Sequence, residues 1–378
     1  MSHAGQPLSD GLTLVTGGTG TIGAPLLESL AVGRETVVSL ARGPHYGVPP
    51  GVRVLSGDIR QGERLGLDED RAASIRARVT TIVHGAALTR FDAPLDAARQ
   101  TNVEGTAHLL AFAATCPRLQ RLLALSTVYV AGRRTGPVLE HELEHGCGFV
   151  NRYEQSKYEA ERLLRDWMIR LPIAVCRLST TIGDSASGHV GRPAAIHQAI
   201  RFLHHSLLPM IPGAPESPVD VIPTDYAVAA IGHLAGPGFT AGRTFHVCAG
   251  SDAPREDELI DLTVDTFIRH RPAWRRRAIE KPVIVDLETY ELFRRSVEAV
   301  ADSALAASVG ILSHFAPQLA FPKTFDDEGC RATLAEAGIC RPPVRETLIN
   351  VVKYLLDHNW GHNSGHDWGT RLPSGAPV

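Results

Sequence analysis

Tyr153 and Lys157 are the two residues of this sequence best suited to move a proton. The segment from Asn151 through Trp167 predicts a helix, and residues four apart on a helix share one face. An ammonium beside a phenol favours the phenolate, so we expect Lys157 to lower the pKa of Tyr153. A phenol with a lowered pKa can donate or accept a proton near neutral pH. The pair therefore predicts an acid/base centre.

Two hydroxyl side chains precede this pair by one β-α-β unit. The apolar run Arg121–Leu125 predicts a buried strand, and Ser126 and Thr127 follow it directly. The loop from there to Tyr153 is long for a compact domain, which favours a functional role. The Y-x-x-x-K spacing alone is common by chance, and its place one β-α-β unit after Ser126 and Thr127, downstream of a glycine-rich turn, makes it specific.

A glycine-rich turn near the start of the sequence provides a place for a phosphate. Leu12, Leu14 and Val15 predict a buried strand that stops at Thr16, and the next helix ends near Gly33. Glycines in the turn allow a tight bend and a close approach of a pyrophosphate to the helix amides. The alternative is a glycine turn that binds no ligand. The predicted cradle consists of Gly17, Thr19, Gly20, Thr21, Ile22 and Gly23.

Arg42 follows the second predicted strand, Thr36–Leu40. An acidic residue here would bind the adenosine ribose hydroxyls of NAD, whereas an arginine suits a 2′-phosphate. The position therefore predicts NADP(H); the alternative is a surface arginine that happens to follow a strand.

Two further strands end in residues that suit a cofactor. Val52–Leu55 leads to Asp58 and Ile59, and Asp58 could contact an adenine or cap the next turn. Thr80–His84 is followed by small residues, which leave room for a cofactor beside the backbone. These small residues are Gly85, Ala86 and Ala87.

Composition limits the class of protein. The chain has 378 residues, 44% hydrophobic and 21% charged, with a formal charge of −3, so no basic field predicts nucleic acid as a partner. The sequence has no apolar run long enough to span a membrane and no secretory leader. Six scattered cysteines indicate free thiols in a reducing compartment. We expect a cytoplasmic protein.

The segment His141–His145 reads H-E-L-E-H, a pattern that binds zinc when it lies on a helix. Here it lies between Pro137 and Gly146, too short and too interrupted for a helix, and no third ligand has a recognisable spacing. A solvated loop is the favoured interpretation, and we predict no metal site.

Together, the motifs TGGTGTIG, HGAA, NVEGT, ST and YEQSK resemble the extended short-chain dehydrogenase/reductase superfamily. The resemblance implies that Tyr153 is the acid/base and that Lys157 lowers its pKa and holds the nicotinamide ribose. It further implies that Thr127, the second hydroxyl residue, binds the reacting oxygen and that Asn102 supports the site. Leu178 and Thr181 are implied as cofactor contacts.

Longer segments resemble one branch, the fatty acyl reductases and thioester reductase domains of the male-sterility type. The branch pattern R-P-S-x-x-x-G-D-S-x-T-G is matched by RLSTTIGDSASG, except that Leu178 replaces proline and Ala186 replaces threonine. These departures bear on a long fatty chain as substrate rather than on the fold. The other matching segments are Phe91–Thr106, Val219–Ile231 and Phe315–Tyr354.

The resemblance implies an α/β fold: a parallel Rossmann sheet flanked by helices, with a smaller, mostly helical C-terminal substrate lobe. We expect an NADP-binding domain at residues 1–182, completed by about 219–250. The lobe would comprise residues 183–218 and 251–358, including an amphipathic helix at Ile284–Ser308. Residues 359–378 predict a flexible tail.

The implied activity is NADPH-dependent reduction of an acyl thioester to an aldehyde, and onward to an alcohol where the reaction continues. Acyl-CoA or an acyl carrier protein would present the acyl group. The basic segment Arg269–Arg277 is either a solvated helix junction or a dock for such a partner. The alternatives on the same fold are a sugar-nucleotide epimerase or dehydratase and a hydroxysteroid-type alcohol dehydrogenase. A nucleotide-sensing protein without activity is a third hypothesis.

Overall fold

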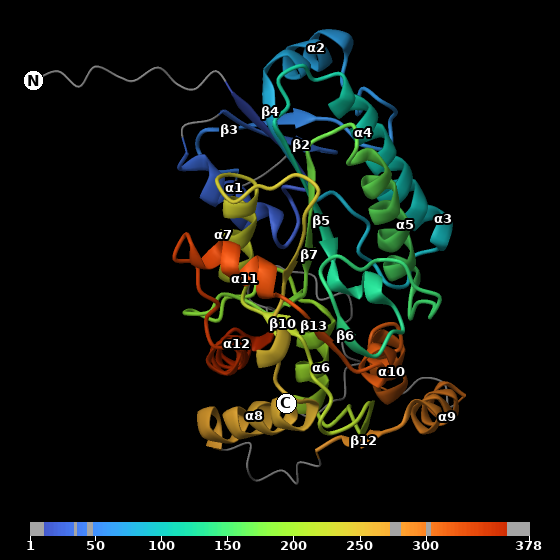
Figure 1. Cartoon of the computed structure of the whole chain (residues 1–378). Coiled ribbons are helices and arrows are strands. Elements are labelled where there is room, and N and C mark those ends of the chain that lie inside the picture. Colours follow the sequence, from blue (N-terminus) through green and yellow to red (C-terminus); the bar gives the residue numbers. More distant parts are fainter. Residues whose placement is uncertain (1–10, 34–35, 44–47, 273–280, 300–303, 361–378) are drawn as a thin grey trace, which may run out of the picture.

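A parallel β-sheet forms the centre of the protein (Figure 1). The structure is a computed structural model that describes residues 11–33, 36–43, 48–272, 281–299 and 304–360. Within these ranges seven strands pair in the order β11-β7-β5-β4-β1-β2-β3, all parallel, which confirms the predicted Rossmann-type fold. The strands are β1 (Leu12–Thr16), β2 (Thr36–Ala41), β3 (Val52–Ser56), β4 (Val79–His84), β5 (Arg121–Thr127), β7 (Ile173–Leu178) and β11 (Thr244–Val247).

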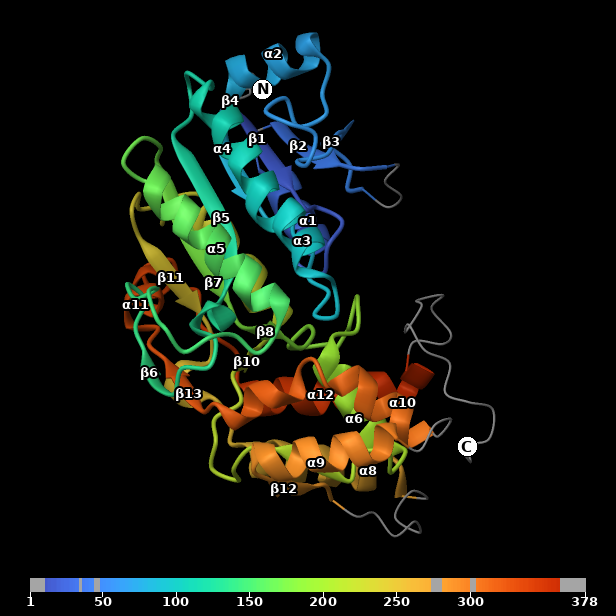
Figure 2. The same cartoon turned by 90° about the vertical axis from the view of Figure 1, so that its right-hand side faces the viewer.

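The central strands β1 and β4 are buried along their whole length because helices cover both faces of the sheet. Side chains alternate between the faces, so Leu14 joins the core under α4 and α5, while Val15 joins the core under α1 and α7. Figure 2 shows α4 and α5 lying along one face of the sheet. The covering helices are α1 (Gly23–Ala31), α2 (Glu69–Arg78), α3 (Leu95–Arg99), α4 (Gly105–Ala114), α5 (Arg152–Trp167) and α7 (Thr224–Leu234).

A second group of helices lies beyond the carboxyl ends of the strands (Figure 2). Helix α12 reaches the sheet region through Asn350, whose side-chain amide donates to the Ser185 carbonyl at 2.9 Å. The domain boundaries drawn from the sequence stay a prediction. The helices of this group are α6 (Ala195–His204), α8 (Glu256–His270), α9 (Leu287–Glu298), α10 (Ala304–Leu312) and α12 (Val344–Asp357).

Three short pairs of parallel strands lie outside the seven-stranded sheet in the described part of the chain. The pair β8 (Thr180–Thr181) and β10 (Val221–Ile222) follows the sheet, and β9 (Met210–Pro212) pairs with β12 (Val283–Val285) beside the second group of helices. The pair β6 (Gly136–Val138) and β13 (Lys323–Phe325) lies beside the sheet edge together with α11 (Glu328–Ala335). Glu140 anchors α11 there by accepting from the backbone N–H groups of His246 and Cys330. The boundaries predicted from the sequence place β13 and α11 in the lobe, whereas in the structure they lie beside the edge of the sheet.

The structure differs from the sequence-based predictions at the amphipathic segment Ile284–Ser308 and at the start of the C-terminal tail. The amphipathic segment Ile284–Ser308 is not one helix, because its start belongs to β12 and Asp286 caps a new helix by accepting from Thr289 N–H at 2.9 Å. The predicted flexible tail does not begin at residue 359. Trp360 is buried, with its ring centroid 5.2 Å from that of His204. Residues 361–378, and 273–277 of the basic segment, lie outside the described residues.

Among the described residues, none of the helices has the length and apolar character needed to cross a membrane. Within the same ranges, His, Cys, Asp and Glu side chains do not gather in threes as a metal site requires.

Candidate active site

The glycine-rich turn lies between β1 and α1 and forms one wall of a cavity of about 550 Å³. Gly17 has φ +79°, and a Cβ there would lie 2.4 Å from the Gly85 carbonyl carbon. At Gly23 a Cβ would lie 2.1 Å from the Gly17 carbonyl oxygen, so α1 can start this close to the turn only with glycine. In the first turn of α1, Ala24 N–H donates to the Gly20 carbonyl at 3.1 Å and Pro25 has no N–H. The N–H groups of Thr21, Ile22 and Gly23 have no acceptor among the described residues and are available to an anion. The turn is therefore built as a phosphate cradle.

The predicted cofactor residues come together around this cavity. Its lining includes every residue that the sequence analysis assigned to the cofactor, from the cradle, the ends of β2, β3 and β4, helix α5 and the end of β7. They are Gly17, Thr19, Gly20, Thr21, Ile22, Gly23, Arg42, Asp58, Ile59, Gly85, Ala86, Ala87, Lys157, Leu178 and Thr181. Their roles as ligands stay a prediction, but their gathering is a property of the fold.

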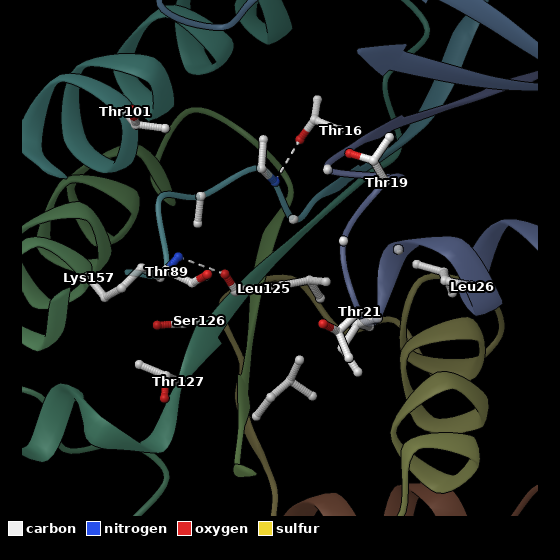
Figure 3. Close-up of a pocket in the computed structure, with 18 of the residues that line it drawn as sticks. Thr16, Thr19, Thr21, Leu26, Thr89, Thr101, Leu125, Ser126, Thr127 and Lys157 are labelled. Carbon is white, nitrogen blue, oxygen red and sulfur yellow. Dashed lines mark hydrogen bonds between the residues drawn. The ribbon is translucent and has the colours of Figure 1, made fainter. Parts of the chain in front are cut away.

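His84, at the end of β4, holds the loop behind the cradle. The Thr16 hydroxyl accepts from Ala86 N–H at 3.2 Å (Figure 3). The same hydroxyl lies 2.8 Å from His84 Nδ1. On the other side, the Thr106 hydroxyl donates to the Asn102 carbonyl at 2.6 Å and accepts from His84 Nε2 at 3.0 Å. The Thr106 bond places a proton on Nε2, and in the neutral imidazole Nδ1 then accepts from the Thr16 hydroxyl. Burial lowers the pKa of His84 to about 3, in agreement with that form.

Acidification is expected to destabilise the fold through His84. The pKa of His84 lies below its ordinary value of 6.5, so its stabilising contribution is present above pH 6.5 and is lost as the pH falls toward 3. The expected loss is about 1.4 kcal/mol per pH unit in this window. Urea unfolding between pH 7 and pH 5 measures it: the His84→Gln variant should show a smaller slope than wild type, and the exposed control His141→Gln an unchanged one. An unchanged slope in His84→Gln contradicts the assignment.

Thr127 and Ser126 point to different partners, which separates the two candidate hydroxyls. Ser126 donates to the Glu161 carboxylate at 2.7 Å, in a buried network behind β5. Thr127 hydrogen-bonds to the Tyr153 phenol, and its hydroxyl also accepts from Tyr129 N–H at 3.2 Å. Both residues line the cavity, but Thr127 is the one whose hydroxyl is directed to Tyr153.

Lys157 reaches from α5 to the carbonyl of Leu125, to which its Nζ donates at 2.9 Å (Figure 3). Burial lowers the pKa of Lys157 to about 8, and the nearby Glu161 carboxylate opposes that shift. Burial raises the pKa of Tyr153 to about 12, and the hydrogen bond from Thr127 opposes it. The expected lowering of the Tyr153 pKa by Lys157 is therefore wrong for this arrangement, because desolvation of the phenol dominates. Tyr153 is protonated at neutral pH, which is the form that donates a proton.

Asn102 does not line the cavity but supports the helix that carries Tyr153. Its Nδ2 donates to the Ser156 hydroxyl at 2.8 Å, and that hydroxyl donates to the Tyr153 carbonyl at 2.9 Å. Its Oδ1 accepts from Leu88 N–H at 2.7 Å, which ties α5 to the loop after β4. Asn102 lies in a one-turn π-helix, η1 (Gln100–Glu104), between α3 and α4, where the sequence predicted regular helical period; such turns are frequent at functional sites.

Several residues around the cavity were not singled out from the sequence. Tyr129, two residues after Thr127, lines the cavity, and its hydroxyl lies 3.0 Å from that of Thr180. The Phe91 ring lies 5.5 Å from the Tyr153 ring and 6.1 Å from that of Phe315, which precedes η5 (Ala316–Ala320) in the lobe. Arg60 also lines the cavity. The spacing Thr127-x-Tyr129 was the available signal for Tyr129, whereas Phe315 is too distant in sequence to be placed.

The segment His141–His145 is confirmed as non-helical. Glu142 accepts from Arg134 at 2.6 Å, and His145 Nε2 lies 2.8 Å from the Val130 carbonyl oxygen. The two imidazoles therefore do not share the helical face that the zinc pattern requires.

Comparisons with known proteins find one family model and several relatives that match parts of this chain. Residues 47–231 match the family model described as male sterility protein. The chain is 27% identical over 270 residues to the nonribosomal peptide synthetase hkm10 of Aspergillus hancockii, which covers 63% of this chain and 26% of that protein. It is 31% identical over 123 residues to the chloroplastic fatty acyl-CoA reductase 2 of Arabidopsis thaliana, covering 32% of this chain and 20% of that protein. The chain thus spans about a quarter of the length of these relatives.

Among solved structures, the terminal R domain from the myxalamid PKS-NRPS biosynthetic pathway matches the whole fold. The TM-score is 0.77 at 25% sequence identity, and the match covers 93% of this chain and 91% of that chain.

Proposed function

We propose that this chain, whose residues 47–231 match the male sterility protein family, is an extended short-chain dehydrogenase/reductase that reduces acyl thioesters to aldehydes with NADPH. One observation carries the proposal: Thr127, Tyr153 and Lys157 line the same cavity as the phosphate cradle. A nicotinamide-dependent oxidoreductase needs both parts within reach of one dinucleotide.

The residues present fit a dinucleotide phosphate. A Cβ at Gly17 or Gly23 would clash with neighbouring backbone, so glycine keeps the turn before α1 tight. A pyrophosphate can approach the N–H groups of this turn at the start of α1. Arg42 is exposed at the end of β2 and suits a 2′-phosphate. NADPH would therefore be held by the cradle at its pyrophosphate and by Arg42 at its adenosine end.

A bound reduced nicotinamide supplies the hydride. Thr127 and Tyr153 donate hydrogen bonds to the thioester oxygen and stabilise it as it gains negative charge. Tyr153 then donates its proton to that oxygen, and Lys157 holds the nicotinamide ribose. Loss of the thiol breaks the C–S bond and leaves the aldehyde. A second hydride, from a second reduced nicotinamide, and a second proton added to the aldehyde would give the alcohol.

The acyl group is proposed to enter between the sheet and the lobe, beside Phe91 and Phe315, whose stacked rings adjoin Tyr153. This makes the helices α6, α8, α9, α10 and α12 the substrate lobe. Coenzyme A or an acyl carrier protein would present the thioester, as the R-domain likeness suggests.

NADPH oxidation tests the proposal, measured against acyl-CoA and carrier-bound acyl thioesters with ketones and sugar nucleotides as controls. Turnover of a thioester with release of a free thiol supports it. Turnover of a ketone or sugar nucleotide without any thioester turnover favours the alcohol dehydrogenase or the epimerase and overturns it.

Arg42→Asp is expected to reverse the cofactor preference. The carboxylate repels a 2′-phosphate and accepts from ribose hydroxyls, so NADPH binding should weaken by roughly 10- to 100-fold relative to NADH. Dissociation constants from calorimetry measure the ratio. The control Arg53→Asp, on the exposed face of β3, should leave it unchanged. An unchanged ratio in Arg42→Asp removes that residue from the 2′-phosphate site.

A further inference from the structure

Two arginines and one aspartate meet where β2 and β3 end. Ala41 pairs with Ser56 in the parallel register, and Gly57 N–H donates to the Ala41 carbonyl at 2.8 Å. The residues that follow the two strands therefore lie side by side, and Arg42, Asp58 and Arg60 all line the cavity. Arg42 is close enough to help Arg60 lower the pKa of Asp58.

Asp58 is fully engaged by Arg60. Its Oδ1 accepts from the Arg60 backbone N–H at 2.9 Å and from Nε at 3.1 Å, while Oδ2 accepts from Nε at 3.0 Å and from Nη2 at 2.6 Å. The carboxylate is buried, so its oxygens have little capacity left for an adenine amino group. The hydrogen bonds from Arg60 also lower the pKa of Asp58, which keeps it ionised.

The same pair fixes the orientation of the Arg60 guanidinium. A guanidinium has five N–H donors, and the carboxylate occupies the edge formed by Nε and Nη2. Nη1 has no acceptor among the described residues, and the side chain keeps 35% of its surface exposed. Arg60 therefore presents the edge of its guanidinium that includes Nη1 to the cavity. Because Asp58 already holds the side chain in place, a ligand that binds this edge costs Arg60 little conformational entropy.

We propose that Arg60, oriented by Asp58, is a second ligand of the cofactor's 2′-phosphate beside Arg42. The inference rests on the proposed use of NADPH. A phosphate monoester carries a charge of about −1.5 to −2 at neutral pH, more than one arginine neutralises. With Asp58 counted, Arg42 and Arg60 give the site a net positive charge and two guanidinium edges for the phosphate oxygens.

The competing role for Arg60 is stacking on the adenine ring. Stacking would strengthen NADPH and NADH binding equally, because both carry the same adenine. A contact to the 2′-phosphate acts on NADPH alone. Ligand pairs that differ only in that phosphate therefore separate the two roles.

Calorimetric titration of the full chain measures the dissociation constants of two ligand pairs that differ only in the 2′-phosphate. The pairs are 2′,5′-ADP with 5′-AMP, and NADPH with NADH. Arg60→Gln should weaken 2′,5′-ADP and NADPH by at least about tenfold and change 5′-AMP and NADH by less than about twofold. Arg60→Lys, which keeps the charge but loses the fork, should fall between Gln and wild type. In the double variant Arg42→Gln/Arg60→Gln, 2′,5′-ADP should bind no better than 5′-AMP.

Arg64→Gln is the matched control, since Arg64 lies in the same loop, pairs with Glu69 and does not line the cavity. It should bind all four nucleotides as wild type does. Equal weakening of both ligand pairs in Arg60→Gln, or no change in either, overturns the proposal.

The outcome is separable from that of the proposed function. Nucleotide binding is read without any thioester, so failure of thioester turnover leaves it unaffected. If wild type binds 2′,5′-ADP no better than 5′-AMP, the NADPH assignment itself is wrong. If wild type has the preference and Arg60→Gln retains it, only the role of Arg60 is wrong.

Discussion

Tyr153→Phe is expected to lower kcat for thioester reduction by about 10³-fold, within the range for loss of a general acid. The substitution removes one hydroxyl that Thr127 hydrogen-bonds and that the proposed reaction uses as its proton source. The ring and its packing against Phe91 remain, so the fold and the affinity for NADPH should hardly change. Single-turnover kinetics and nucleotide titration measure the two effects separately.

Tyr158→Phe is the matched control for this variant. Tyr158 lies on the same helix, but its hydroxyl donates to Glu144 at 2.7 Å, and the residue does not line the cavity. Its removal should leave kcat within about twofold of wild type, since it contacts no reacting atom. Comparable activity in Tyr153→Phe and wild type would remove Tyr153 from the mechanism.

Glu161→Gln is expected to lower the free energy of unfolding by about 3–5 kcal/mol, the range for breaking a buried ion pair. Glu161 and Arg177 are almost fully buried and share hydrogen bonds of 2.6 and 2.9 Å. The variant leaves the Arg177 guanidinium charged and uncompensated behind β5. Denaturant unfolding at neutral pH measures the loss.

Glu159→Gln provides the comparison on the same helix. Glu159 pairs with Arg99 at 2.7 Å, but both side chains are partly exposed, so the expected loss is less than about 1 kcal/mol. Equal losses in the two variants would contradict the role of burial in the Arg177–Glu161 pair.

Local sequence patterns were sufficient for the cradle and the catalytic helix. The turn at Gly17 depends on backbone geometry that only neighbouring residues determine, and Tyr153 and Lys157 are one helical turn apart. The match of residues 47–231 to the male sterility family confirms the resemblance drawn from those motifs. The roles of Tyr153, Lys157, Thr127 and Asn102 stay predictions.

Local sequence patterns could not predict how deeply the Tyr153 phenol is buried, and this burial decides its pKa. The expectation for the Tyr153 pKa considered the charge of Lys157 and not the burial of the phenol, which is the larger effect. Likewise, the choice between Ser126 and Thr127 came from the family likeness. The structure gives its physical basis in the Glu161 carboxylate, which lies 35 positions further along the chain and binds Ser126.

The sequence by itself determined the parallel α/β fold, the phosphate cradle and the helix that carries Tyr153, because each depends on residues within one β-α unit. Only the tertiary structure decided which residues complete the cavity. Arg60 is oriented by Asp58 beside Arg42, and Phe315 comes from the lobe to stack on Phe91. Such contacts depend on strand order and helix packing, which bring residues from separate elements together and which short-range spacing does not encode.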